Sequence, residues 1–304
     1  MAIWILKAVV QKTISFLPAS QRINYFFQKH ITKGVNLSDG WFEDKLIHCS
    51  EHFSAFKKYS KVSENFKVLE LGTGWFPVVP IGLFLCGAHE VLSYDLNSLL
   101  RDENVKATVE KFKTYHRSDN LKKFLPLIND DRLNQLLSSE EKTAKEIFEK
   151  FRIKAIVGDA SRTNILSHSI DLIVSNNVFE HIYPAILTNI LNEFKRITKP
   201  GGVMCHFVDM SDHFAHLDKK ISIYNFLKFS EGKWKMIDNS IQPMNRLRIY
   251  DYRKIYSDLK IPVTEEKSRE GNVLELKQIK LDKKFSTYSP EQTAISHSLV
   301  ISAM

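Results

Sequence analysis

Short apolar runs alternate with longer stretches of helical periodicity through much of the chain. The stretch that begins at Pro184 has apolar residues at intervals of three and four, which is typical of a helix lying on a sheet. These residues are Leu187, Ile190, Leu191, Phe194 and Ile197. The apolar runs predict strands, which lie within 68–76, 90–97, 153–161, 170–182 and 201–209. The pattern therefore predicts an α/β fold, a mostly parallel sheet with helices on both faces.

The first predicted strand ends in an acid and leads into two glycines one residue apart, in the order Glu70, Gly72 and Gly74. Glycine has no Cβ, so it allows positive φ and close approach of the backbone to a ligand. The next strand reaches Asp95, whose carboxylate could accept both hydroxyl hydrogens of a ribose. Together these features predict a nucleoside site, although a glycine pair can also form a plain turn and strand-end acids often only cap helices.

The glycine spacing disfavours NAD and FAD, because Pro77 occupies the third glycine position of the fingerprint G-x-G-x-x-G. The loop instead resembles the first motif of class I S-adenosylmethionine-dependent methyltransferases, usually E/D-x-G-x-G-x-G, with Phe76 at its third glycine. The resemblance continues in order over roughly residues 65–210. Residues 170–182 resemble the D-x-I-x-x-x-x-V-x-E-H segment of many small-molecule, type 11-like members.

This resemblance implies S-adenosylmethionine as the cofactor and a Rossmann-like sheet of seven strands, the last antiparallel. The final two strands are expected within 261–270 and 295–304. In the family an acid after the third strand reads the adenine amino group, a role that falls to Asp159. Asn176 could equally satisfy backbone groups of its loop. The residues expected to bind the cofactor are Glu70, Gly72, Thr73, Gly74, Asp95, Leu96, Asp159, Ala160 and Asn176.

Methyl transfer requires an acceptor nucleophile in line with the sulfonium methyl group, and a hydroxyl acceptor also requires a base. Residues 206–218, after the fifth predicted strand, are the densest source of histidines and acids, and they lie at the carboxyl end of a strand. We expect His213 or His181 to be the base. Asp209 or Asp212 would orient the imidazole. His181 could instead cap or pack at the start of the following helix.

The H-x-x-H spacing of His213 and His216, with acids beside it, could also bind a divalent metal that lowers the pKa of the acceptor. On a helix, however, these two side chains would be neighbours and could equally face solvent. We therefore assign no metal ligand from the sequence.

Residues 3–17 form a predicted amphipathic helix that ends before Pro18. Its apolar stripe consists of Ile3, Leu6, Val10, Ile14 and Leu17. Before the first acid, Asp39, the chain carries only basic charges: Lys7, Lys12, Arg22, Lys29 and Lys33. The helix is too short and too interrupted by lysine to span a bilayer, and no signal-peptide cleavage pattern follows it. It either packs on the catalytic domain or rests on an anionic membrane surface.

We expect a helical N-terminal extension at 1–60 and a methyltransferase domain at 61–304. The domain carries a helical insertion at 98–152 and a substrate cover at 209–250. The insertion is longer than one crossover helix requires and predicts two or three helices.

Two residue pairs in these added segments suggest local roles. Ser138 and Glu141 have the spacing of a capping box, which predicts a helix start in the insertion. Arg246 and Arg248 lie in the cover and would suit an anionic group such as a phosphate, although ordinary packing fits them equally.

Composition agrees with one α/β enzyme, because 304 residues with 43% hydrophobic content can bury a full core. The three cysteines, Cys49, Cys86 and Cys205, form no C-x-x-C pair. A reducing cytoplasm is therefore expected, at the inner face of the membrane if the first helix binds there.

The formal net charge of +8 would suit a polyanion, so an RNA methyltransferase is one alternative. The fourth strand carries SNNV instead of the N-P-P-Y or D-P-P-Y of base-amino methyltransferases, so we expect no nucleic-acid partner. A non-catalytic cofactor-binding module is the other alternative, suggested by Phe76. The favoured prediction is methyl transfer to a small-molecule or glycan- or lipid-linked acceptor, at oxygen more than nitrogen.

Overall fold

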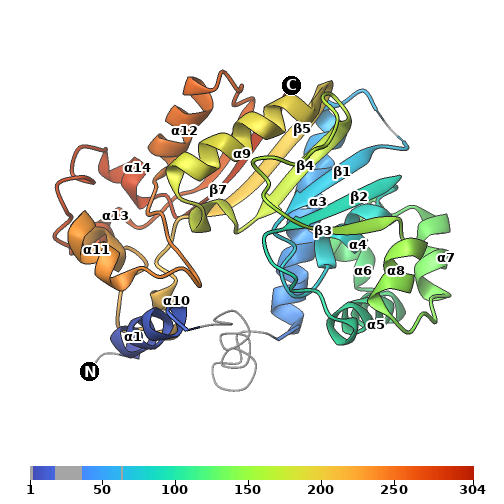
Figure 1. Ribbon diagram of the computed structural model, residues 1–304, viewed down its shortest axis with the longest axis horizontal. Helices are drawn as coiled ribbons and strands as arrows, with labels where there is room; N and C mark the ends of the chain where they lie inside the picture. Colours follow the sequence, from blue (N-terminus) through green and yellow to red (C-terminus); the bar gives the residue numbers. More distant parts are fainter. Residues whose placement is uncertain (1–2, 18–35, 63) are drawn as a thin grey trace.

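The computed structural model describes residues 3–17, 36–62 and 64–304, and a seven-stranded sheet forms its centre (Figure 1). The strands are β1 (Lys67–Leu71), β2 (Glu90–Asp95), β3 (Ile153–Val157), β4 (Ile170–Asn176), β5 (Thr198–Asp209), β6 (Glu265–Arg269) and β7 (His297–Ala303). Their order is β3-β2-β1-β4-β5-β7-β6. Strands β1 to β5 are parallel, and β7 is antiparallel to both β5 and β6. The predicted fold class and antiparallel last strand are confirmed.

Alternate side chains of the central strands enter two separate cores, one on each face of the sheet. Val68 of β1 packs in the core that contains α3 (Asp39–Tyr59) and α4 (Val78–Leu85). Its neighbour Leu69 packs in the core that contains α9 (Pro184–Ile197) and α12 (Ile249–Asp258). All five apolar residues predicted for the helix at Pro184 are buried in α9. The helices cover the faces, which leaves the carboxyl edge of the parallel strands free for a site.

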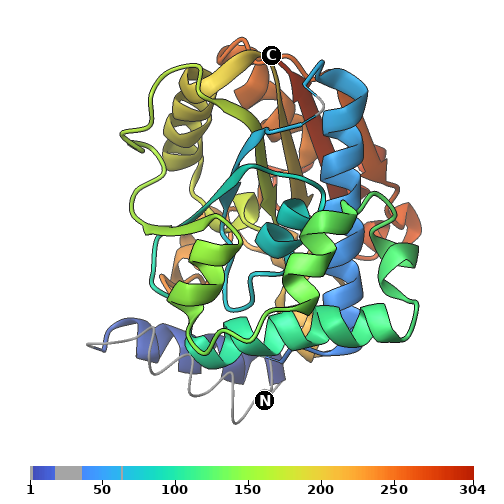
Figure 2. The same cartoon turned by 90° about the vertical axis from the view of Figure 1, so that its right-hand side faces the viewer.

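The insertion after β2 contains four helices among the described residues, not two or three. They are α5 (Asp102–Arg117), α6 (Leu121–Phe124), α7 (Asp130–Leu137) and α8 (Ala144–Lys150). They pack beside α3 and α4, as Figure 2 shows with α3 running along the sheet. The predicted capping box is wrong, because Ser138 ends α7 and the box that opens α8 is Thr143 with Glu146. Ser139 donates to Glu141 instead.

The N-terminal helix α1 (Ile3–Ser15) packs on α10 (Phe214–Leu217) and α11 (Glu231–Ile237). The helix packs on the domain through a face other than the apolar stripe, because α1 buries Trp4, Ala8, Gln11 and Ile14, and of the stripe only Ile14 is buried. The Trp4 ring decides the orientation, since its centroid lies 5.9 Å from those of both Phe214 and Phe229. Pro18, Arg22, Lys29 and Lys33 lie outside the described residues.

The remaining elements are short and follow β4, β5 and β6. They are the 3-10 turns η1 (Phe179–His181) and η2 (Asn225–Lys228), and the helices α13 (Val273–Lys277) and α14 (Pro290–Ala294). With α10 and α11, η2 lies in residues 209–250, the segment that follows β5 and is expected to cover the substrate. This segment is called the cover below.

Candidate active site

The glycine loop leaves β1 in a conformation that requires both of its glycines. Gly72 and Gly74 have φ values of +79° and +72°, a region that side chains with a Cβ rarely adopt. Gly72 donates its N–H to the carbonyl oxygen of Tyr94 at 2.8 Å, which fixes the loop on the adjacent strand β2. A Cβ on Gly74 would meet nothing within 4 Å, so the backbone here is open to a ligand.

Asp95 lies beside this loop, at the end of β2. Its Oδ2 accepts the N–H of Gly74 at 3.1 Å, and burial raises the pKa of Asp95 against the opposing effect of its backbone donors. A cleft of about 250 Å³ opens here between the loop, the end of β3 and α8 of the insertion. Leu96, the next residue, is 70% exposed, so an apolar surface is free beside the carboxylate.

Asp159 and Ala160 follow β3 and lie next to Asp95. Gly158, the residue before Asp159, joins the two strand ends by donating its N–H to the carbonyl oxygen of Asp95 at 2.9 Å. Asp159 accepts the N–H of Ser161 at 2.8 Å, and the hydrogen bonds from Ser161 hold the pKa of Asp159 below its usual value. The two acids therefore occupy neighbouring strand ends, as a ribose site and an adenine site would require.

Glu70 lies under the loop rather than at its surface. Its side chain is buried, and Thr73 donates its hydroxyl to Glu70 Oε2 at 2.5 Å while also contacting Ser93. Burial raises the pKa of Glu70 to about 8, so the carboxyl group is largely protonated at pH 7. Glu70 thus positions Thr73 and the loop, while the loop backbone is left to face the cleft.

Asn176 ends β4 and is held by a residue of the N-terminal extension. His52 of α3 lies 2.8 Å from Asn176 Oδ1, and Asn176 Nδ2 is buried without a partner among the described residues. Lys45 and Asn176 line a small cavity under the glycine loop. The sequence reasoning missed Lys45, His48 and His52, although polar residues three and four apart in an apolar helix mark one shared face.

A second group of side chains surrounds the turn η1, which follows β4. The side chain of Val178, just before η1, covers Gly72, so this turn adjoins the glycine loop. The rings of His181 and His213 lie 4.9 Å apart, edge to face. Asp209 Oδ2 lies 3.3 Å from His213 Nε2, and Asp209 Oδ1 lies 3.3 Å from His297 Nε2. The structure thus brings together all three predicted catalytic residues, His181, His213 and Asp209.

The charges in this group are set by burial and by the contacts between its members. Burial would raise the pKa of Asp209, but hydrogen bonds from His213 and His297 hold it well below its usual range. Burial, with the nearby His213 ring, lowers the pKa of His181 to about 4, so that ring is neutral at pH 7. Burial and the nearby Asp209 raise the pKa of Glu180.

Other acids and histidines of the 206–218 segment have separate structural roles. Asp212 is fully buried and accepts hydrogen bonds from Phe214 N–H and Asn225 Nδ2, so it does not orient either candidate base. His206 lies within the sheet, 2.8 Å from Ser175 Oγ. His216 stacks on His213 at 5.2 Å and contacts Ser211 instead of completing an H-x-x-H pair.

The ring of His181 is fixed by the cover. Its Nδ1 lies 2.7 Å from the carbonyl oxygen of Pro243, so Nδ1 carries the hydrogen and Nε2 keeps a free lone pair. Asn245, two residues later, donates from Nδ2 to the carbonyl oxygens of Phe179 and Ile182 at 2.7 and 2.8 Å. The cover therefore clamps both ends of η1.

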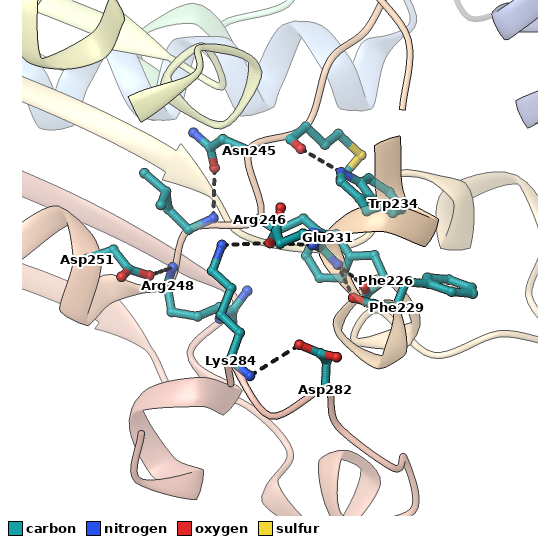
Figure 3. A network of polar contacts seen from close by, with 12 residues as sticks. Phe226, Phe229, Glu231, Trp234, Asn245, Arg246, Arg248, Asp251, Asp282 and Lys284 are labelled. Atoms are coloured by element: carbon teal, nitrogen blue, oxygen red, sulfur yellow. Dashed lines mark hydrogen bonds and ion pairs between the residues drawn. The ribbon is translucent and has the colours of Figure 1, made fainter. Parts of the chain in front are cut away.

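The two arginines of the cover pack within the protein, which favours the packing alternative over an anion site, and Figure 3 shows the acceptors around Arg246. Arg246 donates to the carbonyl oxygens of Phe226 and Phe229 and to Glu231. Arg248 is fully buried and donates to the carbonyl oxygens of Met210, Thr293 and Ile295. The terminal nitrogens of both guanidinium groups donate to protein acceptors and so anchor the segment that carries Pro243 and Asn245.

The comparisons with known proteins agree with this arrangement. Residues 130–206 match the model of a family described as a methyltransferase domain. This match, together with the glycine loop and the strand-end acids, supports S-adenosylmethionine-dependent methyltransferase activity. The match covers the end of the insertion and most of β3 to β5, which carry Asp159, Asn176 and the turn η1. No curated protein gives a significant sequence match.

Several solved structures are similar to this chain in fold, at low sequence identity. One is a complex of the Haloferax volcanii Trm112 methyltransferase activator with a methyltransferase (18% identity, TM-score 0.45, covering 87% of this chain and 92% of that one). Another is geranyl diphosphate methyltransferase with S-adenosylmethionine (10% identity, TM-score 0.48, covering 88% of this chain and 92% of that one). A third is Haemonchus contortus phosphoethanolamine N-methyltransferase 2 with the same ligand (12% identity, TM-score 0.44, covering 83% of this chain and 52% of that one). Similarity at this level does not identify an acceptor.

Proposed function

We propose that the enzyme methylates a hydroxyl oxygen of a small-molecule or glycan- or lipid-linked acceptor. The observation that supports this proposal is the grouping of His181, His213 and Asp209 beside the glycine loop. A hydroxyl must lose its proton as it is methylated, and imidazole and carboxylate groups assist such a loss. S-adenosylmethionine supplies a methyl group on a positively charged sulfur, which leaves as a neutral thioether.

The chain provides separate sites for the two reactants. The glycine loop, Asp95, Leu96, Asp159 and Ala160 lie at the ends of β1 to β3, where they would hold the cofactor. The cover and η1 lie at the ends of β4 and β5, where they would enclose the acceptor and exclude water from it. The acceptor oxygen would form its bond to the methyl carbon here, and its proton would leave on the side of His181 and His213.

The decisive experiment incubates the protein with isotope-labelled S-adenosylmethionine and hydroxylated intermediates of the cell envelope and of secondary metabolism. Mass spectrometry then locates the methyl group. We expect labelled methyl ethers or esters. Labelling of nitrogen, or of RNA, would contradict the proposal, and cofactor binding without transfer to any acceptor would favour the non-catalytic alternative.

A matched set of variants tests the residues themselves. We expect His213→Asn and Asp209→Asn to reduce kcat by about 10²-fold or more, the range of general acid–base effects, with the affinity for S-adenosylmethionine unchanged. His216→Asn is the control, because His216 stacks on His213 outside the group. An equal loss of kcat in the control and in His213→Asn would contradict the catalytic role of His213.

We also propose that the enzyme is cytoplasmic and that α1 contacts an anionic membrane surface. No helix among the described residues is long and apolar enough to cross a bilayer. However, the outer face of α1 and the adjoining part of α11 expose Ile3, Leu6, Val9, Phe16, Leu17 and Met236. A groove of about 480 Å³ lies between these two helices, with Lys233 and Lys235 exposed on α11. Apolar side chains flanked by lysines suit an anionic lipid surface.

Sedimentation with liposomes tests this contact. A variant with Leu6→Ser and Val9→Ser should bind vesicles containing anionic lipid several-fold more weakly than wild type, because both residues are about half exposed on α1. The control is Leu166→Ser with Leu274→Ser, two exposed leucines far from α1 in the sequence. Equal binding of all three proteins would refute the membrane contact.

A further inference from the structure

The carboxylate of Glu180 is buried, and among the described residues only the backbone N–H groups of Glu180 and Asp209 act on it as donors. Its side chain is 3% exposed, and neither oxygen accepts a hydrogen bond of good geometry from the described residues. An ionised carboxylate in such a place is costly unless a cation or donors compensate it. The mechanism proposed above does not use Glu180, so its position between β4 and α9 needs another explanation.

The ligand atoms around Glu180 have the composition of a metal site. One carboxylate oxygen of Glu180 and one ring nitrogen each of His181 and His213 lie within 4.8 Å of one another. His181 donates Nδ1–H to Pro243, which leaves Nε2 as the lone pair that a metal would use. Asp209 contacts the His213 ring, as outer carboxylates do beside metal-bound histidines.

The local charge also favours a divalent cation. Glu180 and Asp209 are two buried carboxylates on either side of the His213 ring, since Asp209 Oδ2 lies 3.3 Å from His213 Nε2 and a Glu180 oxygen lies within 4.8 Å of a nitrogen of that ring. The charge of Lys45 acts on Glu180, but it acts on Glu70 and Asp44 as well, so Glu180 has no lysine of its own among the described residues. A cation between Glu180 and the two imidazoles would compensate both acids.

We propose that Glu180, His181 and His213 bind a divalent transition-metal cation next to the acceptor. Two imidazoles and one carboxylate suit zinc, manganese, iron or cobalt better than magnesium or calcium, which prefer oxygen ligands. Three protein ligands leave coordination positions open, as in catalytic sites. This inference rests on the proposed function, because an open position would hold the acceptor oxygen. The cation would lower the pKa of that hydroxyl. The two imidazoles would then assist the loss of the proton as metal ligands instead of as bases, and the proton would leave to water.

Titration of the untagged full-length chain with Co²⁺ tests the site, since visible absorption and calorimetry both report binding. We expect one Co²⁺ per chain and a rise in melting temperature on binding. Glu180→Gln, His181→Asn and His213→Asn should each weaken Co²⁺ affinity about tenfold or more. Glu180→Gln keeps the shape of the side chain and removes its charge, so it should fold and lose the Co²⁺-dependent rise in melting temperature.

The control is His216→Asn, which alters a neighbouring ring outside the three ligands and should leave Co²⁺ affinity unchanged. Calorimetry with S-adenosylmethionine on the same proteins separates this inference from the proposed function. Normal cofactor binding without Co²⁺ uptake at millimolar concentration would overturn the metal site alone. Equal Co²⁺ affinity in wild type and the three ligand variants would also overturn it.

Discussion

A Cβ atom on Gly72 would lie 2.3 Å from Cγ2 of Val178, closer than two carbon atoms can pack. The contact joins the glycine loop after β1 to the turn after β4, and thus the cofactor side of the site to the acceptor side. It also explains the first glycine by packing as well as by its φ of +79°.

Gly72→Ala and Gly74→Ala should therefore differ in stability. Gly72→Ala combines overpacking with a strained φ and should cost about 3–5 kcal/mol. Gly74→Ala has the strained φ alone, since its Cβ would meet open space, and should cost about 1–2 kcal/mol. Urea unfolding of both variants measures the difference, and Val178→Ala should partly restore Gly72→Ala. Gly74→Ala should nevertheless weaken S-adenosylmethionine binding, because the added methyl group points into the cleft.

The clamp on η1 gives a second prediction, which concerns Asn245. Asn245→Ala would leave two buried carbonyl oxygens without their donor and should cost about 2–4 kcal/mol. Because η1 carries His181, we expect kcat to fall while S-adenosylmethionine affinity stays within about twofold. Chemical unfolding and steady-state kinetics measure the two effects. Asn134→Ala, at an exposed position of α7, should change neither, and an unchanged kcat in Asn245→Ala would show that the clamp does not position His181.

The third prediction separates the two interpretations of Arg248. Arg248→Met should lower stability by about 3 kcal/mol or more, because three buried carbonyl oxygens lose their donor. Arg253→Met removes an ion pair with Glu266 that is partly exposed, and should cost about 1 kcal/mol or less. Thermal unfolding compares the two. If inorganic phosphate stabilised wild type and not Arg248→Met, the anion site would have to be reconsidered.

Strands and sheet-covering helices were predictable because one property, the period of apolar residues, decides them. In the helix after Pro184, all five apolar residues predicted to face the sheet are buried, because a helix that lies on a sheet buries its apolar face. The face of α1 was not predictable in this way, because its partners α10 and α11 lie about 200 residues away in the sequence. Trp4 and Gln11 turn toward those partners, and of the regular apolar stripe only Ile14 is buried with them.

In the candidate site, too, features that follow from local sequence were predictable and features that depend on distant contacts were not. Glycines and strand-end acids could be assigned because neighbouring parallel strands bring their ends together. Asp209 could not be separated from Asp212 by sequence, since one ends β5 and the other follows it by three residues, and only the path of the chain directs Asp209 to His213. His52 reaches Asn176 from α3 over a sequence separation of 124, with no local pattern to connect them. Glu180 lay within the recognised motif, but its burial is a tertiary property.

The last prediction concerns Glu70, whose pKa burial raises to about 8 from an ordinary value of 4.5. The folded state then holds a proton that the unfolded state releases above pH 4.5, so this group makes stability fall between about pH 4.5 and pH 8. The total loss is on the order of 4–5 kcal/mol, at 1.36 kcal/mol per pKa unit. Glu70→Gln cannot ionise and its amide oxygen can still accept the Thr73 hydroxyl, so its stability should lack this decline.

Unfolding free energies of wild type and Glu70→Gln, measured by denaturant from pH 5 to pH 8.5, test this assignment. The unfolding free energy of the variant relative to wild type should increase steadily as pH rises and be largest at pH 8.5. Glu266→Gln is the control, because the nearby Arg253 and Ser268 hold the pKa of Glu266 below its usual value despite burial, so it should gain nothing in this range. Parallel curves for wild type and Glu70→Gln would mean that Glu70 is ionised in the fold, with Lys45 as its counter-ion.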